Sequence, residues 1–321
     1  MYDTHTGTRA SRRVPALLLA LGLLGACSLL AISESGAQSA GEPTLQEAVV
    51  QEMHGGDQAQ TLRAADSSAA EPDQVNVRRS EDGWAFGTAV IPAPNKKGAY
   101  PQGWLFVAEQ TPSGWEVGLE GSPEFSVLAE EAPETVVDAE EKDLFAPSSG
   151  EFTTQATKSR FRLPWHLDRG WTMSGGPHGW STGYDRPYSA LDFNGGDGKV
   201  RSVRQGKAYL MCNTRRGWIR VVHSDGYATD YYHLRGNIKP GSGSKRVDEG
   251  DFLGYTGTDV SCGGSATGRH VHFALRRNGA HVALDGRTIG GWTFQEGQAY
   301  YGYATHNGTR RDTGERLRNY G

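Results

Sequence analysis

In its C-terminal third the chain contains the stretch His270-Val271-His272-Phe273-Ala274-Leu275, followed closely by the turn signal Asn278-Gly279. The stretch is short and rich in residues that favour strands, so it predicts a β-strand. Side chains alternate between the two faces of a strand, so His270 and His272 point to the same side. One of them can then bind a metal ion while the other handles protons beside it.

A His-x-His pair is weak support for metal binding by itself, because ten histidines in 321 residues give accidental pairs. Two upstream segments strengthen it. His178 lies in Ser174–Gly179, which the glycines mark as a mobile loop, and Asp192 lies in Ser189–Phe193, which favours a strand start. Two histidines and one carboxylate satisfy a catalytic zinc ion, which takes three protein ligands and keeps a fourth position open.

Two runs further along carry a family resemblance. They are Val247–Gly257, which contains Asp-Glu-Gly-Asp-Phe-Leu-Gly, and Thr267–Phe273, which contains the His-Val-His pair. They resemble the lysostaphin-type zinc endopeptidases that cut peptidoglycan cross-bridges, over roughly the C-terminal half of the chain. Thirteen residues separate His178 from Asp192, which is similar to the β-lytic branch rather than to the short His-x-x-x-Asp spacing of the lysostaphin branch. The Tyr-Tyr-His-Leu run at 231–234 and two cysteines also fit that branch.

The resemblance implies that His178, Asp192 and His272 bind one zinc ion, while His233 and His270 flank the water and the scissile carbonyl. Histidine, with an ordinary pKa of about 6.5, can accept a proton from water and deliver it to the leaving amine. Because His270 shares a strand face with His272, we expect His270 to be the base and His233 to help stabilise the oxyanion.

Other interpretations of these residues remain open. His233 fits a partly buried strand histidine beside aromatic residues. Asp192 fits a carboxylate that orients a ligand histidine, in which case Asp185 would replace it as a ligand. We interpret His223 and His281 as ordinary surface or packing residues.

The N-terminus has the pattern of a secretory signal peptide, with arginines at 9, 12 and 13 ahead of an almost uncharged apolar stretch, Val14–Ile32. Cleavage after Ala37 fits the small residues there, so residues 1–37 are predicted to be removed from a secreted protein without stable membrane association. Lipidation of Cys27, twin-arginine export and a retained anchor are alternatives. The apolar run continues past Cys27, which argues against lipidation there.

Signal cleavage removes Cys27 and leaves one pair, Cys212 and Cys262. Disulfides persist outside the cytoplasm, so we predict that this pair is bridged. On the chain-entropy model a bridge closing a loop of about fifty residues contributes about 4 kcal/mol to stability. It would also hold the loop around Cys262 beside His270.

Charge reverses along the chain. Residues 1–157 contain 9 Lys and Arg against 23 Asp and Glu, a net of −14, whereas residues 158–321 contain 24 against 14, a net of +10. This asymmetry suggests that an acidic propeptide shields a basic C-terminal domain until secretion. A soluble charged spacer is the alternative.

The acidic region contains three segments that begin with Gly-Trp, at 83–84, 103–104 and 114–115. They predict a small antiparallel β module, preceded by a helix around Leu45–Met53, in which the tryptophans close the core rather than bind carbohydrate. We therefore predict an acidic propeptide with a β module over 38–130, a flexible linker holding the processing site over 131–160, and a zinc endopeptidase domain over 161–321.

The C-terminal domain alternates short strand patterns with glycine turns, and helical periodicity is nearly absent. The expected strands are Lys207–Met211, Trp218–His223, Tyr227–His233, Phe252–Tyr255 and His270–Arg276, with a hairpin turn at Ser224–Gly226. The fold class is mainly β, and the resemblance implies an antiparallel β-sandwich of the lysostaphin type in this domain.

The function predicted is a monomeric, secreted zinc endopeptidase that hydrolyses peptide cross-bridges of bacterial peptidoglycan, with glycine-rich bonds as targets. Its net positive charge suits the anionic wall, and the scattered arginines form no nucleic-acid-binding module. Trp180, Tyr184 and Tyr188 are expected to line a narrow groove for small residues. The alternatives are a protease of glycine-rich proteins and a non-catalytic protein that binds the wall or activates another hydrolase.

Overall fold

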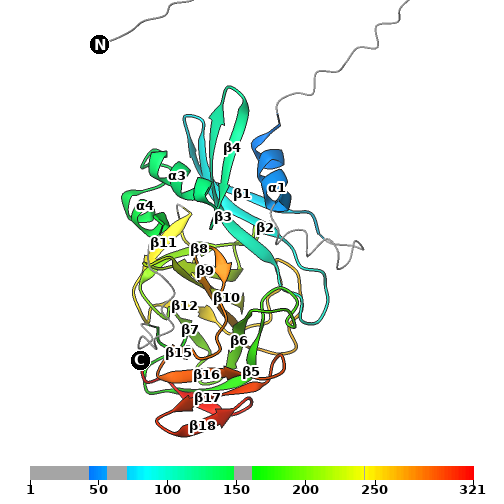
Figure 1. The fold of residues 1–321 in the computed structure, drawn as a ribbon, viewed down its shortest axis with the longest axis vertical. Coiled ribbons are helices and arrows are strands. Elements are labelled where there is room, and N and C mark those ends of the chain that lie inside the picture. Colours follow the sequence, from blue (N-terminus) through cyan, green and yellow to red (C-terminus); the bar gives the residue numbers. More distant parts are fainter. Residues whose placement is uncertain (1–42, 56–70, 148–160, 242) are drawn as a thin grey trace, which may run out of the picture. The chain divides into compact units, whose positions relative to one another are not determined.

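The computed structural model describes residues 43–55, 71–147, 161–241 and 243–321, which belong to one compact unit, Glu42–Gly321. The expected signal peptide, residues 1–37, lies outside the described residues. Antiparallel strands make up most of the regular secondary structure in the described residues, and the helices there are few and short (Figure 1). This confirms the mainly-β prediction. No helix in the described part is long and apolar enough to span a membrane.

The N-terminal module, residues 43–55 and 71–147, is built on one antiparallel sheet in the order β1-β2-β3-β4. Its strands are β1 (Gln74–Glu81), β2 (Trp84–Ile91), β3 (Gln102–Thr111) and β4 (Gly114–Leu119). The three Gly-Trp segments thus form strands as predicted. Trp104 is buried, and Trp84 and Trp115 are half-buried against the same hydrophobic clusters. Their role is core packing.

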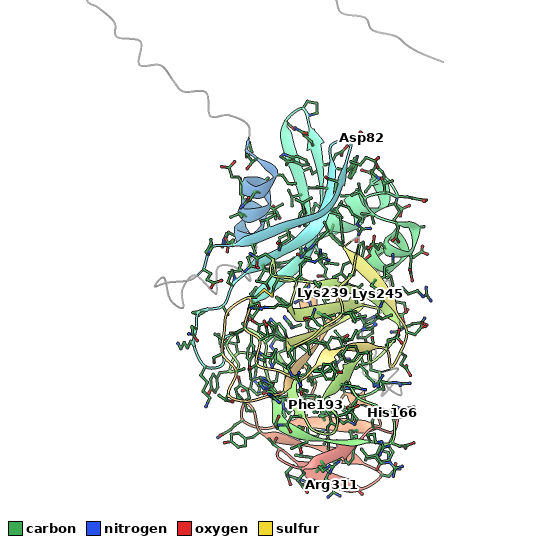
Figure 2. All side chains as sticks on the ribbon, turned by 180° about the vertical axis from the view of Figure 1, so that it is seen from behind. Asp82, His166, Phe193, Lys239, Lys245 and Arg311 are labelled. Atoms are coloured by element: carbon green, nitrogen blue, oxygen red, sulfur yellow. A yellow bond between two sulfur atoms is a disulfide. The ribbon has the colours of Figure 1, made fainter. Side chains whose placement is uncertain are left out.

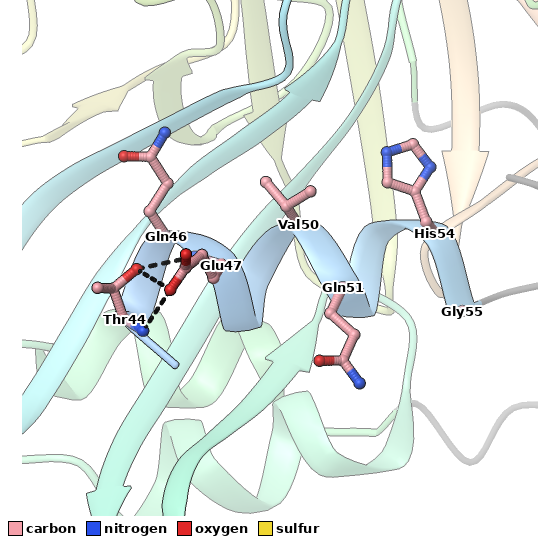
Figure 3. A pocket seen from close by; sticks show the side chains of 7 residues that line it. All are labelled: Thr44, Gln46, Glu47, Val50, Gln51, His54 and Gly55. Atoms are coloured by element: carbon pink, nitrogen blue, oxygen red, sulfur yellow. Dashed lines mark hydrogen bonds between the residues drawn. The ribbon is translucent and has the colours of Figure 1, made fainter. Parts of the chain in front are cut away.

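The expected N-terminal helix is α1 (Leu45–Gly55), and its start is fixed by a capping box (Figure 3). The hydroxyl of Thr44 accepts from the amide of Glu47 at 3.3 Å, and the Glu47 carboxylate accepts from the amide of Thr44 at 2.8 Å. Figure 3 also shows the shallow hollow along this helix. Its two ionisable side chains are already partnered, Glu47 in the cap and His54 with Asp73 at 2.6 Å. The hollow therefore offers no free reactive group.

Two helices cover the sheet of the module, α3 (Pro123–Glu131) and α4 (Ala139–Phe145). The sequence predicts a flexible linker over residues 131–160, and α4 contradicts this for residues 139–145. Residues 148–160 of the predicted linker lie outside the described part of the chain. Asp138 and Glu141 form a capping box that starts α4, and Phe145 is buried against Phe125 of α3. A helix this short shows little hydrophobic periodicity in the sequence. Only its capping residues could have predicted it.

The C-terminal domain is built around a nine-stranded antiparallel sheet in the order β11-β8-β9-β10-β13-β6-β5-β19, with β14 paired to β13. These strands are β5 (Gly170–Gly179), β6 (Tyr188–Asn194), β8 (Gly206–Leu210), β9 (Gly217–Val222), β10 (Tyr227–Leu234), β11 (Ser244–Val247), β13 (Val271–Arg277), β14 (Ala280–His281) and β19 (Arg316–Arg318). The strands expected at 207–211, 218–223, 227–233, 252–255 and 270–276 are confirmed within one or two residues.

Two smaller sheets complete the domain. One pairs β7 (Lys199–Arg201) with β12 (Phe252–Tyr255). The other runs β15 (Thr288–Ile289), β16 (Trp292–Glu296), β17 (Gly302–His306) and β18 (Thr309–Asp312), and it packs against β5. No sequence pattern predicts this last sheet. Its strands are two to five residues long, so each shows at most a few alternating positions.

The hydrophobic core of the domain lies between these sheets and includes Trp165, Trp171 and Phe193, all essentially inaccessible to solvent. Figure 2 labels Phe193 among the side chains of this domain. The Trp165 and Trp171 rings stack with centroids 5.2 Å apart. A second cluster, on the other face of the large sheet, joins residues of this domain to residues of the N-terminal module. The large sheet is therefore covered on both faces and serves as a rigid base for the side chains described next.

Candidate metal centre

Asp192 and His272 are brought together by strand pairing. They lie directly opposite each other in the ladder between β6 and β13. Opposite residues of an antiparallel pair project to the same face with their Cβ atoms about 5 Å apart. The carboxylate of Asp192 thereby reaches Nδ1 of His272 at 2.9 Å. Asp192 lies inside a strand, not at its start.

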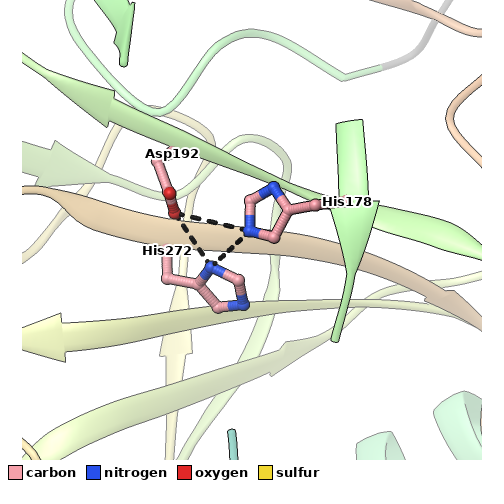
Figure 4. Close-up of side chains that lie close together, drawn as sticks. All are labelled: His178, Asp192 and His272. Carbon is pink, nitrogen blue, oxygen red and sulfur yellow. Dashed lines mark hydrogen bonds and ion pairs between the residues drawn. The ribbon is translucent and has the colours of Figure 1, made fainter. Parts of the chain in front are cut away.

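His178 joins this pair from the last residues of β5 (Figure 4). We expected a mobile loop there, and the structure instead shows a buried strand interrupted by register shifts. Gly175 lies opposite Asp192, and a Cβ at Gly175 would come within 2.6 Å of the Asp192 carboxylate. The glycines that suggested a loop leave room for the carboxylate.

The three side chains form a cluster whose donor atoms all lie within 4.8 Å of one another. Nε2 of His178 is 3.2 Å from Nδ1 of His272 and 3.7 Å from a carboxylate oxygen of Asp192. Three ligands of one tetrahedral zinc ion would lie about 3.3–3.6 Å apart. Two imidazole nitrogens and one carboxylate oxygen are donors that can hold a divalent metal ion, and a cation between them would offset the repulsion of their lone pairs.

The protonation states of these groups also suit a cation. Burial lowers the pKa of His178 and lowers that of His272 to about 4, so both rings are neutral near pH 7. Burial alone would raise the pKa of Asp192. The electrostatic effects of His178 and His270, together with the hydrogen bond from His272, outweigh burial and hold that pKa below its usual value. Neutral imidazoles and an ionised carboxylate are the forms that bind metals.

His270 lies immediately before β13, where it pairs with Gly257 in an isolated bridge. Its Nε2 is 3.6 Å from the Asp192 carboxylate, so it faces the cluster from the same side as His272. The alternation argument from the sequence therefore places both histidines correctly. His270 is 9% exposed, whereas His178 and His272 are fully buried, so it lies at the open side of the cluster.

His233 reaches the cluster through a bulge in β10. Tyr232 is the residue opposite His272, so in a regular strand His233 would point to the other face. The pairing with β9 shifts register between Tyr231 and Leu234, and His233 has a φ of 66°. This bulge turns its ring to within 4.8 Å of the His270 ring, centroid to centroid.

Three of the histidines share one hydrogen-bond arrangement. Nδ1 of each lies within 3 Å of a backbone carbonyl to which it can donate: Gly176 for His178, Asp259 for His233 and Gly268 for His270. Donation from Nδ1 leaves Nε2 as an unprotonated acceptor in the neutral ring. Nε2 of His233 is buried and has no partner among the described residues.

Two tyrosines that no sequence motif marks also line the site. Tyr300 stacks on His178 with centroids 4.0 Å apart. Tyr100, from the N-terminal module, lies parallel to His272 at 3.8 Å, and its hydroxyl is 3.3 Å from that of Tyr300. Neither tyrosine lies in a motif, so only the fold reveals them.

The remaining candidates are placed as follows. Trp180 is buried and packs 4.8 Å from the His272 ring, Tyr188 is buried, and Tyr184 is 61% exposed at the rim. Asp185 is exposed in a turn and lies outside the cluster. His223 is fully buried, which fits a packing residue.

Cys212 and Cys262 form the predicted disulfide, with Cα atoms 5.7 Å apart. Both are fully buried. The bridge connects the end of β8 to the loop 260–264, and the hydroxyl of Tyr232 donates to the Gly263 carbonyl in that loop at 2.6 Å. This anchors the loop beside the bulge that carries His233.

Residues 186–284 match the model of Peptidase family M23. The chain carries an M23 peptidase domain. Protease LasA of Pseudomonas aeruginosa is 33% identical over 147 residues, which make up 44% of this chain and 34% of that protein. The beta-lytic metalloendopeptidase of Lysobacter enzymogenes is 27% identical over 137 residues, 40% of this chain and 71% of that protein. The similarity thus spans about a third of LasA.

Among solved structures, the deep-sea M23 metalloprotease pseudoalterin is 31% identical to this chain, with a TM-score of 0.45. The match covers 50% of this chain and 99% of pseudoalterin. Asp192, His233, His270 and His272 lie within the residues matched to the M23 family, and His178 lies eight positions before them. The N-terminal module lies outside that match.

Proposed function

We propose that this protein is a secreted zinc endopeptidase that hydrolyses peptide cross-bridges of bacterial peptidoglycan, with bonds between glycines as its targets, and that it is made as a proenzyme. The observation that carries the proposal is the buried cluster of His178, Asp192 and His272, with His270 beside it and His233 next to His270. The M23 domain supports peptidase chemistry.

His178, Asp192 and His272 would hold the zinc ion. When bound, zinc polarises a carbonyl oxygen and makes water acidic enough to react near neutral pH. The fit rests on the donor distances and on the two neutral imidazoles and one ionised carboxylate described above. The bond from Nδ1 of His178 to the Gly176 carbonyl orients that ring.

His270 is the proposed general base. Its Nδ1 is held by the Gly268 carbonyl, which leaves Nε2 free to accept a proton from water and return it to the leaving amine. His233 is proposed to help position the attacking water, because its Nε2 is a buried acceptor without a partner among the described residues and its ring lies next to His270. This replaces the oxyanion role expected from the sequence, since an unprotonated Nε2 cannot donate to an oxyanion.

The choice of substrate and location rests on three observations. The sequence resembles lysostaphin-type enzymes of the β-lytic branch, which act on cross-bridges. The region 158–321 has a net charge of +10, which favours association with an anionic wall. The leader pattern and the disulfide both fit an extracellular protein.

Proenzyme status is supported by Tyr100. Its ring covers one face of His272, and the module to which it belongs must move before a substrate can occupy that position. The acidic character of the module, opposite a basic domain, fits the same role.

The test is digestion of two purified peptidoglycans, one with pentaglycine cross-bridges and one with direct cross-links, by the protein before and after limited proteolysis. Mass spectrometry of the products should show new glycine termini from the pentaglycine wall only, and the His272→Ala protein should release none. Release from neither wall by the processed protein would contradict the proposal. Preferential cleavage of glycine-rich proteins would move the substrate to the alternative class.

A further inference from the structure

We propose that the N-terminal module stays bound to the C-terminal domain after the chain between them is cut, so that activation needs a second event that removes the module. This inference rests on the proposed proenzyme and concerns its regulation. It follows from the contacts between the module and residues 161–321, which tie the two parts together independently of the peptide linking them.

The first contact is a segment of the module, residues 93–102, that runs between two loops beside the metal cluster. On one side the amide of Ala93 donates to the Cys262 carbonyl at 3.0 Å, and the Ala93 carbonyl accepts from the amide of Gly264 at 3.2 Å. On the other side the amide of Tyr100 donates to the Ser181 carbonyl at 3.0 Å. The segment is thus bonded through its backbone to both loops.

The fit between this segment and the loop at 262–264 is close. A Cβ built at Gly263 would lie 2.0 Å from the Ala93 carbonyl oxygen, and one at Gly264 would lie 2.4 Å from that of Ala99. Both glycines also have positive φ angles. The main chain of the segment 93–102 therefore packs directly against the loop 262–264. Side chains at Gly263 and Gly264 would prevent this contact.

The second contact is a shared hydrophobic core. Phe86, Leu105 and Val107 of the module belong to one buried cluster with Tyr209 and Trp218 of the C-terminal domain. All five side chains are fully buried. Separating the two parts would expose them to water, at about 25 cal/mol for each Å² of apolar surface.

The third contact pairs acidic residues of the module with basic residues of the domain. Glu120 pairs with Arg220, which also holds Asp230, and Asp138 pairs with Lys207. Glu140 is 2.6 Å from Arg246. Arg220 is fully buried and Lys207 nearly so, hence losing the module would leave two cations without these acidic partners. The acidic N-terminal region and the basic C-terminal domain, seen as a charge reversal in the sequence, thus form specific ion pairs with each other.

Cutting the connecting chain removes none of these contacts. It lowers the effective concentration of the module from about 1 mM, an order of magnitude for parts joined in one chain, to the protein concentration in the assay. A complex at about 1 µM then survives if its dissociation constant is well below that value. Interfaces with a buried aromatic centre and charged pairs around it commonly reach such affinities.

The experiment introduces the recognition sequence of a specific protease between residues 150 and 156 of the full chain. The purified protein is cut at about 1 µM, and size-exclusion chromatography and hydrolysis of a pentaglycine peptide are followed together. We expect the two fragments to elute as one species at the volume of the uncut chain, with peptide hydrolysis unchanged. Hydrolysis should rise only after a second protease has digested the module. Separation of the fragments upon cutting would overturn the inference.

Matched variants test the ion pairs. Glu120→Gln combined with Asp138→Asn should raise the dissociation constant of the cut complex by about 30-fold or more, because each change removes one acidic partner that the module supplies to a buried cation of the domain. Glu116→Gln, at an exposed position of β4, should leave it unchanged. Equal dissociation constants for the double variant and the control would contradict the assigned interface.

The elution result decides the inference whether or not the peptide is hydrolysed. Hydrolysis by the material whose module has been digested decides the proposed function. Failure of one and failure of the other are therefore distinguishable in the same experiment.

Discussion

At the residue scale, the site depends on the orientation of single side chains. His233 faces the cluster only because its backbone adopts φ 66° within a bulge, a conformation that costs a non-glycine residue about 1–3 kcal/mol. The bond from Nδ1 of His233 to the Asp259 carbonyl holds the ring in that position. Strained residues of this kind are common where a side chain must be aimed at a reacting group.

The role of His270 gives a direct prediction. His270→Ala should lower kcat on a pentaglycine peptide by about 10²- to 10⁴-fold, the usual contribution of a general base, while zinc content stays the same because His270 is not a ligand. His166→Ala is the control, since His166 is exposed (Figure 2). Loss of zinc together with activity in His270→Ala would reassign His270 to the ligand set.

What the sequence predicts at this scale follows from local geometry. The alternation of a strand is enough to place His270 and His272 on one side. The orientation of the His233 side chain follows only from the family resemblance. The bulge that turns this side chain depends on how β10 pairs with β9 and β13, and no local sequence pattern encodes that pairing. Tyr100 and Tyr300 lie far from the histidines in sequence and come into contact with His272 and His178 only through tertiary packing.

At the scale of the elements, the hairpin of β9 and β10 is the best-predicted part of the site. The turn signal Ser-Asp-Gly places Asp225 and Gly226 at positive φ angles, as a tight hairpin requires. For β5 the turn-forming residues are misleading. Its glycines predict a loop, yet one of them makes space for Asp192 inside a strand.

His223, at the end of this hairpin, predicts a pH dependence of stability. Burial lowers its pKa from the usual 6.5 to about 3 in the folded chain. The unfolded chain therefore binds the proton first as pH falls, and the stability due to neutral His223 is present above pH 6.5 and is lost between about 6.5 and 3. In urea unfolding at several pH values, His223→Gln should reduce the slope of unfolding free energy against pH by up to about 1.4 kcal/mol per unit.

Parallel pH profiles for the wild type and His223→Gln would contradict this assignment. The comparison is specific, because the other buried histidines are present in both proteins and contribute equally to both slopes.

The disulfide gives a second prediction at this scale. Replacing both Cys212 and Cys262 by alanine should lower the free energy of unfolding by about 4 kcal/mol, since the bridge spans fifty positions of sequence. Urea denaturation in oxidising buffer measures the difference. Equal unfolding free energies would show that the loop 260–264 is held by its hydrogen bonds alone.

At the scale of the whole molecule, the charge reversal was the informative signal. It predicts an acidic region that shields a basic domain, and the ion pairs of Glu120, Asp138 and Glu140 supply a structural basis for that proposal. The C-terminal boundary of the module was harder to predict than its charge. The helix α4 lies where composition indicates a linker, and its burial depends on α3 and on the Tyr209 hydroxyl bound to Glu141 at 2.9 Å.

The covering of His272 by Tyr100 predicts latent activity. Tyr100→Ala in the full chain should raise the hydrolysis of a pentaglycine peptide by about 2- to 13-fold, because the lost ring contact, about 0.5–1.5 kcal/mol, favours opening of the site. Val127→Ala, at an exposed position of α3, is the control. Equal rates for the Tyr100→Ala and Val127→Ala proteins would show that Tyr100 does not limit access.

The central claim is that His178, Asp192 and His272 hold a catalytic zinc ion, and elemental analysis of the dialysed protein tests it most directly. We predict about one zinc per chain in the wild type and in His166→Ala, and none in His272→Ala with an unchanged circular dichroism spectrum. A full complement of zinc in folded His272→Ala, or no zinc in the wild type, would contradict the claim.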